Sequence, residues 1–145
     1  MAITQAIANA FKEQLLEGDQ NFASGGDKFK LALYTSSATL NSATTSYTTT
    51  QEVSASGSYT AGGGDLTGQN TSIASGVAIV DFADLSFTGV TLTARGALIY
   101  NTSSAVTNAA VAVLDFGADK TATSGTFTVQ FPAFTTSAAI LRISG

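Results

Sequence analysis

The ten carboxylates are the side chains of this sequence best suited to acid–base chemistry, because the chain contains no histidine and no cysteine. Asp81 and Asp84 lie three residues apart beside an expected turn, and Asp115 and Asp119 flank a glycine. Two facing carboxylates about 5–10 Å apart could hydrolyse a glycosidic bond. Aspartates at turns more commonly accept hydrogen bonds from the nearby backbone. We therefore expect a structural role for these four residues.

Nucleophilic and metal chemistry have little basis in this composition. No serine has a histidine to act as its general base, and no Ser-x-x-Lys motif occurs. The usual histidine and cysteine ligands of zinc are missing, and the acidic spacing of a calcium-binding loop does not occur. We expect a protein that is not an enzyme and needs no cofactor.

Two further motifs have simple structural interpretations. Gly62–Gly64 is glycine-rich, but the Lys-Ser/Thr continuation of a phosphate-binding loop does not follow it, so a flexible turn is expected. Asn70-Thr71-Ser72 and Asn101-Thr102-Ser103 match the glycosylation acceptor pattern. We interpret both matches as chance, because no secretory signal accompanies them.

Arg95 and the tyrosines each leave two interpretations open. Arg95 lies in the middle of an expected strand, where its charge could face solvent or pair across an interface. The four tyrosines could stack on a sugar or pack half-buried in the domain, and their dispersion along the chain favours packing. They are Tyr34, Tyr47, Tyr59 and Tyr100.

The composition predicts one domain, residues 1–145, that associates with other proteins. Hydrophobic residues make up 44% of the chain, which argues against disorder, and charged residues only 11%. A surface with so few charges is weakly protected from association, so we expect the chain to form homo-oligomers. The net charge is −4 and the six cations are scattered, so nucleic-acid binding is not expected.

The sequence also bears on the compartment. No apolar stretch reaches the roughly 18 residues of a membrane-spanning helix. The first 18 residues lack the positive region and the uninterrupted apolar run of a signal peptide. We expect no membrane association and folding in the cytoplasm in which the chain is made.

Residues 1–18 form the one convincing helical pattern. Ile3, Ile7, Phe11 and Leu15 recur every four residues and would form one apolar row. Gly18 is suited to end the helix, because it enters the left-handed conformation at low cost. The row could pack on the protein's own sheet or dock on a neighbouring subunit, so these four residues are the candidate interface.

The pattern of the rest of the sequence predicts a mainly β fold, either an antiparallel β-sandwich or a jelly-roll-like barrel, with the one N-terminal α-helix. Turns are expected at Asp84, Thr88-Gly89, Asn101–Ser104, Gly117–Asp119 and Ser124-Gly125, and Pro132 should close a strand. Residues 36–70 are rich in Ser, Thr and Gly and predict a long, partly extended excursion with one or two weak strands. The expected strands are Lys28–Thr35, Ile73–Phe87, Thr91–Asn101, Ala109–Phe116, Gly125–Phe131 and Ser137–Ile143.

Three stretches carry a family resemblance. They are MAITQAIANAFKEQLLEG, FKLALYTSSATLNSATTSYTTTQEVSASGSYTAGG, and ARGALIYN continuing to AVAVLDFGADKTATSGTFTVQFP. Together they resemble small virion structural proteins of tailed bacteriophages, among them capsid decoration (cement) proteins. The resemblance covers nearly the whole chain, and its motifs are structural, so no functional residue is transferred.

The resemblance implies a β-rich domain present in many copies on the virion surface, made in the host cytoplasm. It implies that the chain binds the major capsid protein and stabilises the head shell, as a homo-oligomer that is often a trimer in such proteins. The alternative is a tail or fibre component that contacts the host surface and binds carbohydrate. Copy number per particle distinguishes the two roles.

Overall fold

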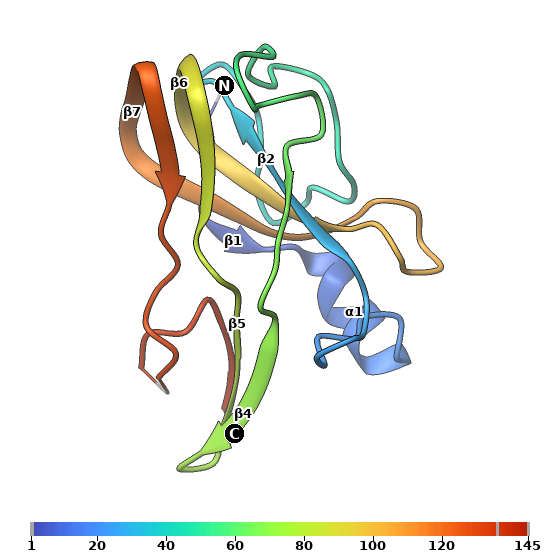
Figure 1. Ribbon diagram of the computed structural model, residues 1–145. Coiled ribbons are helices and arrows are strands. Elements are labelled where there is room, and N and C mark those ends of the chain that lie inside the picture. Colours follow the sequence, from blue (N-terminus) through green and yellow to red (C-terminus); the bar gives the residue numbers. More distant parts are fainter. Residues whose placement is uncertain (1, 136, 145) are drawn as a thin grey trace.

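The computed structural model describes residues 2–135 and 137–144 and confirms a mainly β protein with one short helix near its N-terminus (Figure 1). A five-stranded sheet has the order β1-β7-β6-β2-β3, and a three-stranded sheet has the order β4-β5-β8. All pairings within both sheets are antiparallel. The elements are β1 (Ala6–Ile7), α1 (Asn9–Glu17), β2 (Phe29–Tyr34), β3 (Gly64–Asp65), β4 (Asn70–Ala74), β5 (Val77–Asp81), β6 (Leu85–Asn101), β7 (Ala109–Val129) and β8 (Leu141–Ser144).

The helix is shorter than the sequence pattern predicts. It begins after Ala8, which is extended, while Ala6 and Ile7 form β1 on the edge of β7. Ile3 forms a bridge with Leu40 and lies outside the helix, so the expected helical row of four residues is wrong in its first half. Strand pairing explains the difference, because β7 offers these residues a partner strand that a helix would leave unused. Gly18 ends the helix at φ 82°, as predicted.

The long hairpin of β6 and β7 is the largest unit of the fold. Three expected turns, at Thr88-Gly89, Gly117–Asp119 and Ser124-Gly125, lie inside these strands as irregularities of register, so their prediction as chain reversals is wrong. Residues with positive φ, such as Gly117 at 80°, let one strand hold extra residues while the pairing continues on both sides. The hairpin therefore bends sharply instead of ending (Figure 1).

The expected strand Ile73–Phe87 contains a reversal that the sequence analysis missed. Ser75 and Gly76 both have positive φ and join β4 to β5 by a tight turn. Leu85 then begins β6, so Asp84 does mark a break between strands. Pro132 follows the end of β7 as predicted, and the last strand is confined to Leu141–Ser144.

The excursion at 36–70 lies along one edge of β2. Before Asn70, where β4 begins, its one strand is β3, as expected for a weakly extended segment. Leu40, Val53, Tyr59 and Leu66 are buried, and the Val53 N–H donates to the Leu33 carbonyl. In β2 itself five of the six residues are buried, rather than alternate ones.

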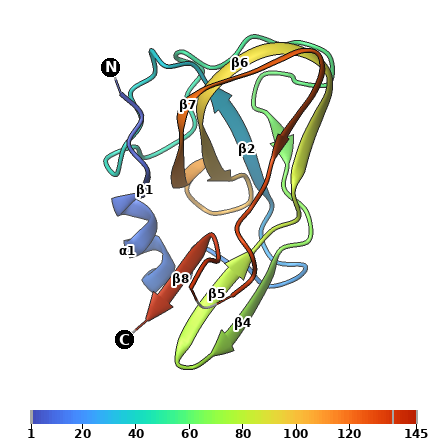
Figure 2. The same ribbon diagram turned by 90° about the vertical axis from the view of Figure 1, so that its left-hand side faces the viewer.

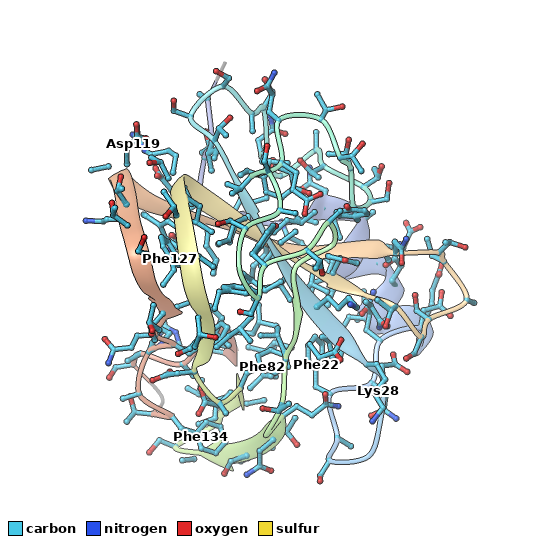
Figure 3. The ribbon with its side chains drawn as sticks, turned by 45° about the horizontal axis from the view of Figure 1, so that its top comes forward. Phe22, Lys28, Phe82, Asp119, Phe127 and Phe134 are labelled. Atoms are coloured by element: carbon cyan, nitrogen blue, oxygen red, sulfur yellow. The ribbon has the colours of Figure 1, made fainter. Side chains whose placement is uncertain are left out.

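An aromatic cluster joins the helix to both sheets. Phe22 stacks on Phe29 at 4.5 Å between ring centroids and meets Phe11 edge-on at 5.8 Å. Phe82, which follows β5, contacts the rings of both Phe22 and Phe29 (Figure 3). These rings bury large apolar areas, so they fix α1 and the small sheet relative to β2.

Candidate interface groove

An apolar groove of about 330 Å³ lies between α1 and the three-stranded sheet. One side of the groove is lined by Ile7 on β1 and by Phe11 and Leu15 on α1. Val80 and Leu141 are among the residues that line the sheet side. Figure 2 shows α1 beside β8, at the end of the molecule that carries the small sheet.

Exposed aliphatic side chains gather on the elements that border this groove. Leu16 on α1 is 90% exposed, Ile73 on β4 is 77% exposed and Ile143 on β8 is 58% exposed. Ile7 on β1, which also lines the groove, is 36% exposed. Among the described residues, one other large hydrophobic side chain is exposed, that of Val106 in the loop after β6. Among these exposed residues, Ile7 and Ile143 line the groove itself.

The four residues predicted as an interface are divided by the structure. Ile3 is buried in the core, where its side chain approaches Gly96 so closely that a Cβ there would lie 2.9 Å from it. Ile7, Phe11 and Leu15 come together along the groove. Phe11 is only 3% exposed and belongs to the aromatic cluster, so it packs on its own domain, and Leu15 is half-buried.

A buried polar network includes Gln20, which lines the groove, and no local pattern in the sequence predicts it. Asn101, fully buried, donates from Nδ2 to Gln20 Oε1 and to Asp27 Oδ2, both at 2.8 Å. Gln20 in turn donates to Gln14 Oε1 on α1 at 2.8 Å. The network connects the helix, the following loop and the end of β6. Buried amide groups need such partners, since an unpaired one costs free energy.

The same network explains the Asn101-Thr102-Ser103 motif. Asn101 Oδ1 accepts hydrogen bonds from the N–H groups of Ser103 and Ser104, and its Nδ2 is used inside the fold. The side chain is therefore closed to modification in the folded protein. Asn70, in the other motif, lies exposed on β4.

All four tyrosines, although dispersed along the chain, converge around Glu52 and pack within the domain, as the sequence favoured. The carboxylate accepts from Tyr47 at 2.6 Å, from Tyr59 at 2.7 Å and from the Gly62 N–H at 2.8 Å. Tyr100 stacks on Tyr47 at 4.8 Å between centroids and donates to the Gly62 carbonyl. Tyr34 donates to the Thr48 carbonyl.

This cluster holds the excursion in place. Tyr34, Tyr59 and Tyr100 are buried and every tyrosine hydroxyl has an internal partner, so these residues do not form a sugar-stacking surface. Burial, with the nearby Glu52 charge adding to it, raises the pKa of Tyr100 to about 12. Burial is also the largest cause that raises the pKa of the other three tyrosines far above the usual value.

The glycine-rich turn belongs to the same region and is tightly packed, where a flexible turn was expected. Gly63 has φ 83°, and a Cβ there would lie 1.8 Å from the Leu31 carbonyl oxygen. Only glycine fits such a close approach of two backbones. Gly62 presents both its N–H and its carbonyl to the cluster around Glu52.

Of the four aspartates, Asp84 and Asp115 make structural contacts, whereas Asp81 Oδ1 is buried without a hydrogen-bond partner among the described residues. Asp115 accepts from the Gly117 N–H at 2.9 Å and pairs with Arg95 Nε at 3.4 Å, so Arg95 has a partner within its own hairpin. Asp84 accepts from the distant Phe131 N–H, and Asp119 is exposed at the bend of β7. Within residues 2–135 and 137–144, no three acidic residues come together as they would to hold a metal ion.

Comparisons with known proteins identify no relative. No family model, no curated protein and no solved structure matches the chain. Among the described residues, no helix has the length and apolar character needed to cross a membrane. The lining of the groove is mostly apolar, and it includes the partly exposed Ile7 and Ile143.

Proposed function

We propose that this chain is a structural protein of a tailed-bacteriophage virion, a capsid decoration (cement) protein that binds the major capsid protein and stabilises the head shell. The observation that carries the proposal is the apolar groove between α1 and the small sheet, with Leu16, Ile73 and Ile143 exposed on the elements that form it. The sequence resemblance to virion structural proteins supplies the partner.

The groove would bind by burying aliphatic surface on the shell. Each square ångström of apolar surface removed from water contributes about 25 cal/mol, so a few large side chains dominate such a contact. Many copies on one lattice add avidity when neighbouring copies also touch each other. The aromatic cluster and the network around Asn101 keep the walls of the groove in position before binding.

The rest of the fold suits a protein that must persist without performing chemistry. The excursion at 36–70 is tied to β2 through Tyr59 and to its own Gly62 through Glu52. Segments held by such internal hydrogen bonds open less readily than free loops. A durable β domain is what reinforcement of a shell requires.

The first test is the copy number of the chain in purified particles of the phage that encodes it. Quantitative mass spectrometry should find it at a number comparable to that of the major capsid protein. A few copies per particle would favour the tail or fibre role, and absence from the particles would overturn both roles.

The second test uses the groove itself. Ile143→Asp places a charge on the exposed rim and should abolish binding to undecorated heads while leaving the melting temperature unchanged. Val106→Asp is the matched control, because Val106 is a similarly exposed aliphatic residue at a different place, and it should bind as the unaltered protein does. Equal binding by both variants would contradict the assignment of the groove.

A further inference from the structure

The outer edge of β4 is an unprotected strand edge. Within the described residues, β4 pairs only with β5, and all five of its residues are exposed. Figure 2 shows it on the outside of the three-stranded sheet. An edge of this kind presents unpaired N–H and carbonyl groups that can pair with another strand.

The turn at Ser75-Gly76 shows which groups point outward. Two central residues with positive φ, here 52° and 76°, are typical of a type I′ hairpin, in which the flanking residues exchange hydrogen bonds. Ala74 and Val77 flank this turn, so alternate residues of β4 bond to β5 and the others face outward. The backbone N–H and carbonyl groups of Thr71 and Ile73 therefore point away from β5. In agreement with this, the Thr71 N–H donates to the side chain of Asn70 at 2.9 Å rather than to β5.

β4 lacks the features by which other edges are protected. Edge strands are usually very short or carry Lys, Pro or other charged residues. β1 and β3 have two residues each, and β8 carries Arg142. The segment Asn70–Ala74 is longer and contains no charged residue and no proline.

We propose that a second copy of this chain pairs its β4 with this edge across a two-fold axis, so that the two small sheets form one continuous six-stranded sheet. A two-fold axis makes an antiparallel pair of identical strands self-complementary, and an uncharged strand brings no like charges together. The register that uses both outward residues sets Thr71 opposite Ile73 of the second copy. Ile73, 77% exposed in the single chain, then gains a cross-strand neighbour. The inference does not depend on the proposed role in a virion.

A cysteine placed at the centre of this register gives a direct test. Ser72 would face its own counterpart as a non-hydrogen-bonded pair, with about 4.5 Å between the Cα atoms, which suits a disulfide. The natural chain has no cysteine, so Ser72→Cys introduces a single thiol. Mild oxidation should convert most of this variant to a covalent dimer. Ser54→Cys, at an exposed serine in the excursion, is the control and should form little covalent dimer under the same oxidation. Equal cross-linking of the two variants, or none, would overturn the proposal.

Sedimentation analysis tests the backbone pairing. The unaltered protein should dimerise in the micromolar range, and Ile73→Pro should be monomeric because it removes an outward N–H. Ile73→Thr keeps the N–H and should still dimerise, with weaker affinity. If Ile73→Pro does not fold, Ile73→Lys replaces it and should likewise be monomeric. A dimer that persists in the folded variant, or an unaltered protein that stays monomeric, would contradict pairing through β4.

Discussion

The hydroxyl of Tyr59 donates a 2.7 Å hydrogen bond to the carboxylate of Glu52 and lies 2.8 Å from the N–H of Leu33, which donates to it. One buried hydroxyl thus connects the excursion to β2. Tyr47 and the Gly62 N–H complete the set of donors around the carboxylate. Hydrogen bonds to an ionised group are shorter and stronger than those between neutral groups, so Glu52 organises a segment that has little regular structure of its own.

Replacement of Glu52 by glutamine should destabilise the protein. The amide has one acceptor oxygen in place of two, so either the Tyr47 hydroxyl, or the Tyr59 hydroxyl and the Gly62 N–H, would lose its acceptor. The expected loss in the free energy of unfolding is about 1–3 kcal/mol. Urea denaturation measures it, with Glu13→Gln on the exposed side of α1 as the control. A loss no greater than that of the control would show that the carboxylate is not needed to hold the excursion.

The protein should lose stability at alkaline pH. Burial holds the pKa of Tyr100 at about 12 and raises the pKa of the other tyrosines further, whereas tyrosine in an unfolded chain titrates near pH 10. Above about pH 10 the unfolded chain releases protons that the folded protein keeps, so the stabilisation present below that pH falls as the pH rises through the folded pKa values. Urea denaturation at a series of pH values should record this decline. Tyrosinate absorbance in the native protein should appear at higher pH than in urea, and coincident titrations would contradict the burial of the cluster.

Asn101→Asp tests the network beneath the groove. The change keeps the shape of the side chain but places an oxygen where Nδ2 now donates to Gln20 and Asp27. Two carboxylates would then share a buried site, and one must take up a proton. The melting temperature should fall at neutral pH and recover partly as the pH is lowered. Asn70→Asp, at an exposed position, should change the melting temperature little.

The β elements were largely predictable because their residues carry the pattern locally. The alternation in Lys28–Thr35 and the apolar runs after Thr91 identify strands without tertiary information. The expected turns at Gly117 and Gly89 failed for a physical reason. A residue with positive φ serves a reversal and a bulge equally well, and only the partner strand decides between them.

The groove was only partly predictable. The recurrence of Ile7, Phe11 and Leu15 identified one wall, but the other wall consists of short strands far along the chain. Ile3 was misplaced because spacing alone cannot reveal that the neighbouring residues pair with β7. The convergence of the tyrosines on Glu52 depends entirely on the path of the excursion and leaves no local signal in the sequence.

A pair of matched substitutions on α1 separates the core of this helix from its surface. Phe11 is 3% exposed among aromatic rings, and Leu16, five residues later, is 90% exposed. Phe11→Asp buries an unpaired charge, whose cost of several kcal/mol is comparable to the total stability of about 5–15 kcal/mol, so the domain should unfold. Leu16→Asp should leave the melting temperature within about one degree, because surface changes rarely exceed about 0.5 kcal/mol. Near-UV circular dichroism and thermal denaturation of both variants provide the measurement. If Phe11→Asp melted as the unaltered protein does, the helix would not be anchored through the aromatic cluster, and the groove would have no fixed wall on that side.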